Sequence, residues 1–196
     1  MDTVQSLGFF SHNIVWMGWN TLLAIVPMVL ARVLQKSISK FGQSLLLVLW
    51  LAFLPNTLYM ITDVIHLFNP RFGQMTVLFK LLGIALYFGV FVIAVTSFVL
   101  AMRPVLHKYR SRIQRLSTHF RIVLFIVFSL LMGFAIGMGR FKRTNTWYLL
   151  TQPIRVIQDI VASLTDPVVL WLAVWYALGA FVIVIITSRH VFSNEP

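Results

Sequence analysis

The sequence contains no cysteine, and only five of its 196 residues are acidic. The absence of cysteine excludes disulfide bonds and metal sites built from thiolates. Charge of either sign is scarce: 11% of the residues are charged and 59% are hydrophobic, against about 25% and about 45–50% in a typical soluble domain. The sequence also lacks a glycine-rich phosphate loop, a nucleophile elbow and a zincin helix, so it indicates no cofactor.

Five long apolar runs account for the shortage of charge. A helix needs about 20 apolar residues to cross a bilayer core about 30 Å thick, and each run approaches or exceeds that length. A backbone that crosses lipid must satisfy its own hydrogen bonds, which favours helices here. The sequence therefore predicts an all-α polytopic membrane protein, with a single transmembrane domain over residues 1–196. The five helices are expected at about residues 13–34, 43–67, 76–102, 122–138 and 168–187.

Basic residues outnumber acidic ones by 16 to 5, which gives a formal net charge of +11. In a soluble protein this excess would indicate nucleic-acid binding, but no motif of a nucleic-acid-binding module is present and most cations lie between the apolar runs. We therefore expect the lipid bilayer, and not nucleic acid, to be the partner of this charge. The segment from Arg103 to Arg121 predicts an amphipathic helix on the membrane surface, bound to anionic lipid head groups. A second interfacial helix is expected after Pro153.

The distribution of the basic residues predicts the orientation of the chain. With the amino terminus outside, ten lysines and arginines fall on the inner side and six on the outer side, as the positive-inside rule requires. The carboxyl terminus then lies inside, because the number of spans is odd. The inner residues are Arg32, Lys36, Lys40, Arg103, Lys108, Arg110, Arg112, Arg115, Arg121 and Arg189. The outer residues are Arg71, Lys80, Arg140, Lys142, Arg143 and Arg155.

A polar stripe interrupts the second apolar run. At roughly 100° per residue, its five polar side chains fall within an arc of about 120° on one helix. The stripe contains Asp63, and an acid within a membrane span usually marks a buried partner or a site. We expect an outward-facing polar pocket in which Asp63 pairs with Arg140 or Arg143, because a paired acid is far less costly to bury than a lone one. The candidate pocket residues are Asn20, Asn56, Tyr59, Thr62, Asp63, His66, Arg140, Arg143, Asn145 and Trp147.

Three interpretations of this stripe remain open. The polar residues can form a purely structural network, in which one of them satisfies the carbonyl group of Leu51 that Pro55 leaves free. They can instead support binding or assembly with a ligand, a lipid or a membrane-protein partner, which is the function we prefer. The alternative is an enzyme acting on a lipid or envelope precursor, because Asp63 and His66 share a helix face and can act as a base with its orienting group. The same two residues are weak candidates for metal ligands, since a metal needs more ligands than they supply.

Four motifs in the chain are distinctive in combination. They are Trp19-Asn20 followed by Pro27, the string Pro-Asn-x-x-Tyr-x-x-Thr-Asp-x-x-His from Pro55 to His66, Gly139-Arg-Phe141 with Arg143, and Asn145-Thr-Trp147. In these motifs the chain resembles an uncharacterised family of bacterial membrane proteins, the domain-of-unknown-function family 1361. The family often has an acid after the last tryptophan and another tryptophan before the last asparagine, where this chain has Tyr148 and Thr144. If that acid belonged to a metal or proton site, the site would be incomplete here. The resemblance implies a bacterial cytoplasmic (inner) membrane protein and implies no activity.

Overall fold

The computed structural model describes residues 3–193, and within them it contains helices and no strand. Five helical stretches of the described chain are long and apolar enough to cross a membrane: Asn13–Lys36, Lys40–Phe68, Val77–Arg115, Thr118–Lys142 and Pro167–Ser193. The predicted all-α fold with five membrane-spanning helices is therefore confirmed. The elements are α1 Thr3–Lys36, α2 Lys40–Phe53, α3 Pro55–Tyr59, η1 Met60–Phe68, α4 Pro70–Gly73, α5 Val77–Arg115, α6 Thr118–Lys142, α7 Tyr148–Thr151, α8 Pro153–Leu164 and α9 Pro167–Ser193.

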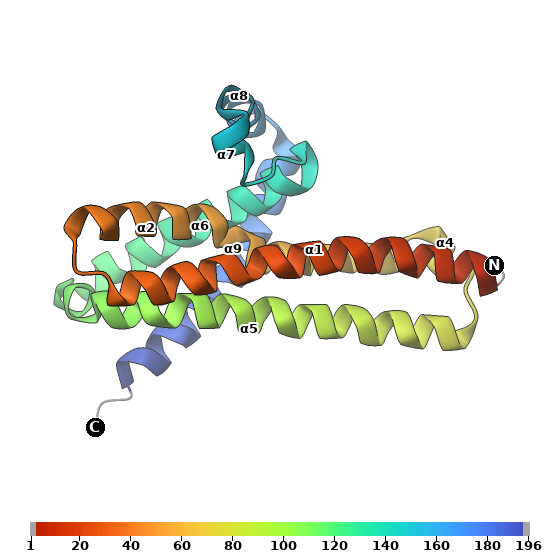
Figure 1. Cartoon of the computed structure of the whole chain (residues 1–196), viewed down its shortest axis with the longest axis horizontal. Coiled ribbons are helices and arrows are strands. Elements are labelled where there is room, and N and C mark those ends of the chain that lie inside the picture. The colour runs from red at the N-terminus through yellow and green to blue at the C-terminus, as the bar shows by residue number, and fades with distance from the viewer. Residues whose placement is uncertain (1–2, 194–196) are drawn as a thin grey trace.

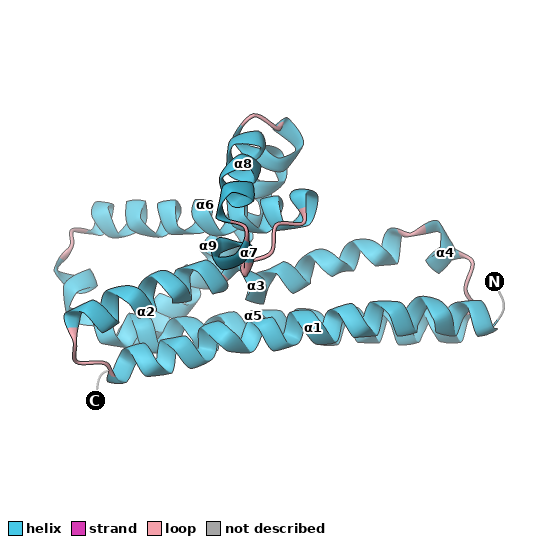
Figure 2. Ribbon diagram, turned by 45° about the horizontal axis from the view of Figure 1, so that its top comes forward, coloured by secondary structure: helices cyan, strands magenta, loops and turns pink. Residues whose placement is uncertain are grey.

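The bundle is built from two helix pairs. α1 and α5 lie side by side along the length of the molecule, and α2 packs beside α1 (Figure 1). The second pair is α6 with α9, and α9 also packs against α5. The core between the pairs is fully apolar at its centre, where Leu34, Phe98 and Val184 have no exposed surface. α8 lies across the direction of α1 and α5 instead of along it (Figure 2).

Two glycines bring the α6 and α9 backbones into direct contact. A Cβ atom on Gly133 would lie 2.1 Å from the carbonyl oxygen of Ala173 and 2.7 Å from the backbone nitrogen of Ala177. One turn further on, a Cβ atom on Gly137 would lie 3.2 Å from the carbonyl oxygen of Val169. Small residues at this spacing allow close packing of helices in a membrane. The Gly-x-x-x-Gly motif therefore forms an internal helix–helix contact of the bundle.

The basic segment from Arg103 to Arg121 differs from the expectation. It does not form a separate helix on the membrane surface, because α5 continues without interruption to Arg115 and α6 begins at Thr118. The physical reason is packing: Val105 and Leu106 in this extension are buried against the core. The second expected interfacial helix is present as α8.

Two cations of this extension cap the C-terminal ends of neighbouring helices. Lys108 Nζ donates to the carbonyl oxygens of Gln35, at 3.3 Å, and Ser37, at 2.9 Å, at the end of α1. Arg110 Nη2 donates to the carbonyl oxygen of Phe192 at 2.8 Å, in the last turn of α9. Carbonyl groups at a helix C-terminus have no partner within the helix and carry partial negative charge, so a cation there is stabilising. We call this side of the molecule, where α1 and α9 end, the basic end.

The second membrane span is broken where a single helix was expected. α2 ends at Phe53, Pro55 begins α3, and the chain continues from Met60 as the 3₁₀ helix η1. Proline has no N–H group to continue the α-helical hydrogen bonds. The side chains that follow take over part of that bonding: Asn56 Nδ2 donates to the carbonyl oxygen of Phe53 at 2.9 Å, and Thr57 Oγ1 donates to that of Leu54 at 2.7 Å. The polar residues of this span therefore help to stabilise the break.

Candidate functional site

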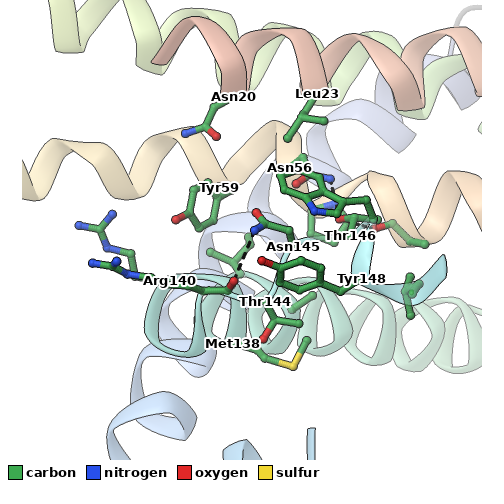
Figure 3. Close-up of a pocket in the computed structure, with 18 of the residues that line it drawn as sticks. Asn20, Leu23, Asn56, Tyr59, Met138, Arg140, Thr144, Asn145, Thr146 and Tyr148 are labelled. Atoms are coloured by element: carbon green, nitrogen blue, oxygen red, sulfur yellow. Dashed lines mark hydrogen bonds between the residues drawn. The ribbon is translucent and has the colours of Figure 1, made fainter. Parts of the chain in front are cut away.

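A cavity of about 1200 Å³ lies between α1, the broken second span, α6 and the segment that follows α6. Figure 3 shows Asn20 and Leu23 of α1 on one side of it, with Arg140, Thr144 and Tyr148 on the opposite side. Nine of the ten residues predicted from the sequence line this cavity. They are Asn20, Asn56, Tyr59, Asp63, His66, Arg140, Arg143, Asn145 and Trp147.

Thr62 is the candidate that the cavity lining does not include. Its side chain is buried, and its Oγ1 atom has no hydrogen-bond partner among the described residues. The α-helical spacing used for the prediction placed Thr62 at the edge of the polar stripe. The observed 3₁₀ geometry has three residues per turn instead of 3.6, which aligns Asp63 with His66 and changes the position of their neighbours around the axis.

Asp63 is the only acidic side chain that the described residues contribute to the cavity lining, and it is 6% exposed. Arg140 Nη1 lies 3.6 Å from Asp63 Oδ1, and Asn20 Nδ2 donates to Asp63 Oδ2 at 3.4 Å. Each carboxylate oxygen therefore has a partner from a different helix, α6 or α1. The predicted pairing of Asp63 with Arg140 or Arg143 is confirmed for Arg140.

Asn56 and Trp147 join the broken span and α1 to the segment after α6. Asn56 Nδ2 donates to Thr146 Oγ1 at 3.0 Å, in addition to its bond with the backbone. Trp147 meets Trp19 of α1 edge to face, with ring centroids 6.0 Å apart. Tyr59 lies against Gly139, where a Cβ atom would be 3.5 Å from the Tyr59 ring. These contacts hold the segment after α6 against one side of the cavity.

His66 is placed to face the cavity from η1 and lies near Tyr87 of α5, with ring centroids 6.3 Å apart. Asp63 and His66 together supply two potential metal ligands. Among the described residues no third histidine or acidic side chain joins them. A zinc site takes at least three protein ligands, so the donors on the described chain do not form one.

A second ion pair joins the two ends of the segment between α6 and α9. Lys142 Nζ, in the last turn of α6, lies 3.2 Å from Asp166 Oδ2. Asp166 also caps α9, because its Oδ1 accepts the backbone N–H groups of Val168 at 3.1 Å and Val169 at 3.3 Å. The hydrogen bond from Lys142 is the main reason that the pKa of Asp166 is below its ordinary value. The chain thus leaves the bundle at Lys142 and returns to the same place at Asp166.

Three residues that the sequence interpretation did not select also contribute to the site. Asn13 lines the cavity, is 7% exposed, and has an Nδ2 atom without a hydrogen-bond partner among the described residues. Thr57 is fully buried, and its hydroxyl group donates to the Leu54 carbonyl oxygen, which also accepts the backbone N–H group of Thr57. Thr144 donates through Oγ1 to Asp159 Oδ2 of α8. Asn13 was detectable as an amide at the edge of an apolar run, whereas the two threonines give no distinctive pattern.

The comparison with protein families gives one result that covers most of the chain. The family described as "Protein of unknown function (DUF1361)" matches residues 19–187. The chain belongs to this family. The match confirms the resemblance found in the motifs, and it runs from Trp19 in α1 to Thr187 in α9, so it includes all ten candidate residues. No curated protein and no solved structure matches the chain. The family description states no activity, so the geometry of the cavity is the basis for a functional proposal.

Proposed function

We propose that this protein binds an amphipathic lipid, or a lipid-linked envelope precursor, in the cavity. We further propose that it lies in the bacterial cytoplasmic membrane with its amino terminus outside and its carboxyl terminus inside. The basic end then faces the cytoplasm, in keeping with ten basic residues on that side against six on the other. The cavity opens toward the outer leaflet. The observation that supports the binding proposal is that the cavity lining is apolar at one end and polar at the other.

The part of the cavity nearer the basic end is apolar. α1 runs toward the basic end and contributes Leu23 after Asn20, while α2 and α6 run away from it and contribute Val48 and Leu131 before their polar residues. Polar and aromatic side chains line the other part. A ligand that fits both parts has an apolar chain and a polar head, and its chain lies at the depth of the membrane spans.

Two contacts of the second span, one with α6 and one with the segment after α6, lie on either side of the apolar part. On the side of the basic end, Trp50 of α2 stacks with Phe128 of α6, with centroids 6.1 Å apart. On the other side, Asn56 donates to Thr146. The volume of the whole cavity, about 1200 Å³, exceeds the roughly 300–1,000 Å³ of most small-molecule sites. The cavity is therefore large enough to take an acyl chain together with its head group.

The proposal can be tested by filling the apolar part with a large side chain. Ala135 of α6 lines the cavity, and Ala85 of α5 is an exposed alanine outside the lining. We expect Ala135→Trp to weaken binding of a monoacylglycerol with a fluorescent acyl chain at least about tenfold in lipid nanodiscs, and Ala85→Trp to leave it unchanged. The melting temperature of each variant shows whether it remains folded. Equal binding by both folded variants, or no binding by the wild type, contradicts the proposal and redirects the search to a membrane-protein partner.

The rival function, an enzyme acting on a lipid or envelope precursor, has one observation in its favour. Asp63 and His66 both face the cavity and are aligned by η1. Both oxygens of Asp63 already have partners, so Asp63 would orient the site and His66 would act as the base. His66→Gln separates the two functions: an enzyme loses conversion of the extracted cavity lipid, measured by mass spectrometry, while binding is retained.

Anionic head groups at the basic end form the second part of the proposed lipid contact. Lys108 and Arg110 are engaged with helix ends, and Arg112 and Arg115 are the exposed cations of the α5 extension. The double variant Arg112→Gln with Arg115→Gln is expected to retain fewer anionic phospholipids in native mass spectrometry. Unchanged retention would assign these residues to topology alone.

A further inference from the structure

The end of α6 carries three cations, and two of them are neutralised within the described chain. Arg140 lies beside Asp63, and Lys142 lies beside Asp166. Arg143 forms no ion pair with any residue that the structure describes. Its side chain lines the cavity and is exposed, which places it at the mouth. Within residues 3–193 the lining therefore has one carboxylate against two guanidinium groups, and its excess positive charge belongs to Arg143.

The backbone at Arg143 is unusual. Arg143 ends α6 with φ 53° and ψ 35°, and it is the one non-glycine residue with positive φ among the described residues. Glycine is the usual residue in this left-handed conformation, and another side chain there has a cost in stability. The chain accepts this cost at the corner where α6 turns toward the cavity. No acidic partner within the described residues accounts for an arginine at this position.

A second donor lies inside the cavity without a partner. Asn13 is more than nine-tenths buried, and its Nδ2 atom has no hydrogen-bond acceptor among the described residues. A buried donor without an acceptor is destabilising, so such groups in folded proteins are usually satisfied by water or a ligand. An ester or hydroxyl oxygen between the head and the chain of a lipid has the chemistry to accept this hydrogen bond.

We infer that the cavity selects an amphiphile with an anionic head group, a phosphate or carboxylate, and that Arg143 is the residue that binds this anion. The inference rests on the proposed function, because it needs a ligand whose chain occupies the apolar part. Arg140 is not the anion-binding residue, since Asp63 already faces its guanidinium group. A guanidinium group at the mouth suits a head group, which stays at the water interface while its chain enters the membrane.

The test compares two probes that carry the same fluorescent acyl chain, a neutral monoacylglycerol and an anionic lysophosphatidic acid. The wild type is expected to bind the anionic probe at least about tenfold more tightly. Arg143→Gln should bring the ratio of the two affinities to about one, and Arg143→Lys should retain part of the preference. The matched control is Arg155→Gln, which removes the same charge from the same region but outside the lining, where Arg155 pairs with Asp159.

The outcomes separate this inference from the proposed function. If the wild type binds neither probe, the proposed function fails. If the wild type binds both probes equally, or if Arg143→Gln keeps the anionic preference, the inference fails and the proposed function stands. Inorganic phosphate as a competitor distinguishes the source of the anion: displacement of the anionic probe at millimolar phosphate would assign the site to a free anion and contradict a lipid head group.

Discussion

The contact between α6 and α9 predicts a large effect for the smallest possible change, Gly133→Ala. The added Cβ atom would lie 2.1 Å from the carbonyl oxygen of Ala173, whereas ordinary contacts begin at 3.4 Å. The atoms in the way belong to the backbone of α9, which cannot rotate aside as a side chain can. The two helices must therefore separate by up to about 1.3 Å, the difference between these two distances, over a contact that also supports Met132 and Ile136 in the cavity wall.

The magnitude follows from two opposing effects. Overpacking a well-packed contact costs about 1–3 kcal/mol, while alanine stabilises a helix interior by about 1 kcal/mol relative to glycine. We expect the free energy of unfolding of Gly133→Ala to fall by up to about 2 kcal/mol. Gly179→Ala in α9 is the matched control: nothing lies within 4 Å of its added Cβ, so only the helix-propensity gain applies. Gly137→Ala, at 3.2 Å from the carbonyl oxygen of Val169, should fall between the two.

The assay is equilibrium unfolding of each variant in mixed micelles, followed by circular dichroism. The order of stability should be Gly179→Ala, Gly137→Ala and then Gly133→Ala, from most to least stable. A Gly133→Ala variant as stable as Gly179→Ala would refute the reasoning, because it would mean that α6 and α9 are free to move apart without loss of packing.

Three further predictions concern the charged contacts. Asp63→Asn and Arg140→Gln should each lower the free energy of unfolding by about 1–3 kcal/mol. The loss is smaller than the about 3–5 kcal/mol expected for a fully buried ion pair, because Arg140 is 22% exposed. Additive losses in the double variant would show that the two side chains are not coupled. The pKa of Asp166 is lowered, so its stabilising contribution is present above the unfolded-state value of 3.8 and is lost as the pH falls through the folded-state value. The melting-temperature difference between wild type and Asp166→Asn should therefore shrink from neutral pH to about pH 3, and a constant difference contradicts this. Lys108→Met should speed hydrogen exchange in the last turn of α1, whereas Arg112→Met should not; equal exchange in both would show that the Lys108 hydrogen bonds do not stabilise that end.

The number of spans and the central ion pair were predictable because charged residues are rare in this sequence. Long apolar runs have few possible structures in a protein this poor in charge. Asp63 is the only acid within the second run, and cations that the predicted orientation places on the outer side are rare enough to indicate a partner. The pairing with Arg140 follows from this, although the choice between Arg140 and Arg143 did not. That choice depends on the corner at the end of α6, which gives no signal in the sequence.

The break in the second span and the length of α5 were not predictable from the apolar pattern. Hydropathy is the same whether the second span stays one α-helix or breaks at Pro55 and becomes 3₁₀ over residues 60–68, and the outcome depends on local hydrogen bonds made by Asn56 and Thr57. For α5, charge predicted a change of direction at the membrane surface. The helix instead continues, because Val105 and Leu106 are buried against the core. Lys108 and Arg110 of the same extension also cap two neighbouring helices. Tertiary packing outweighed the local pattern in that region.

The Lys142–Asp166 pair has a consequence for how this protein can vary. Because the pair fastens the end of α6 to the start of α9, the 23 residues between them depart from and return to one point of the bundle. Their number is not set by the distance between two spans. Insertions, deletions or exchanges in this stretch can therefore alter what covers the cavity while the α6–α9 contact stays intact, so ligand preference is free to diverge on an unchanged scaffold.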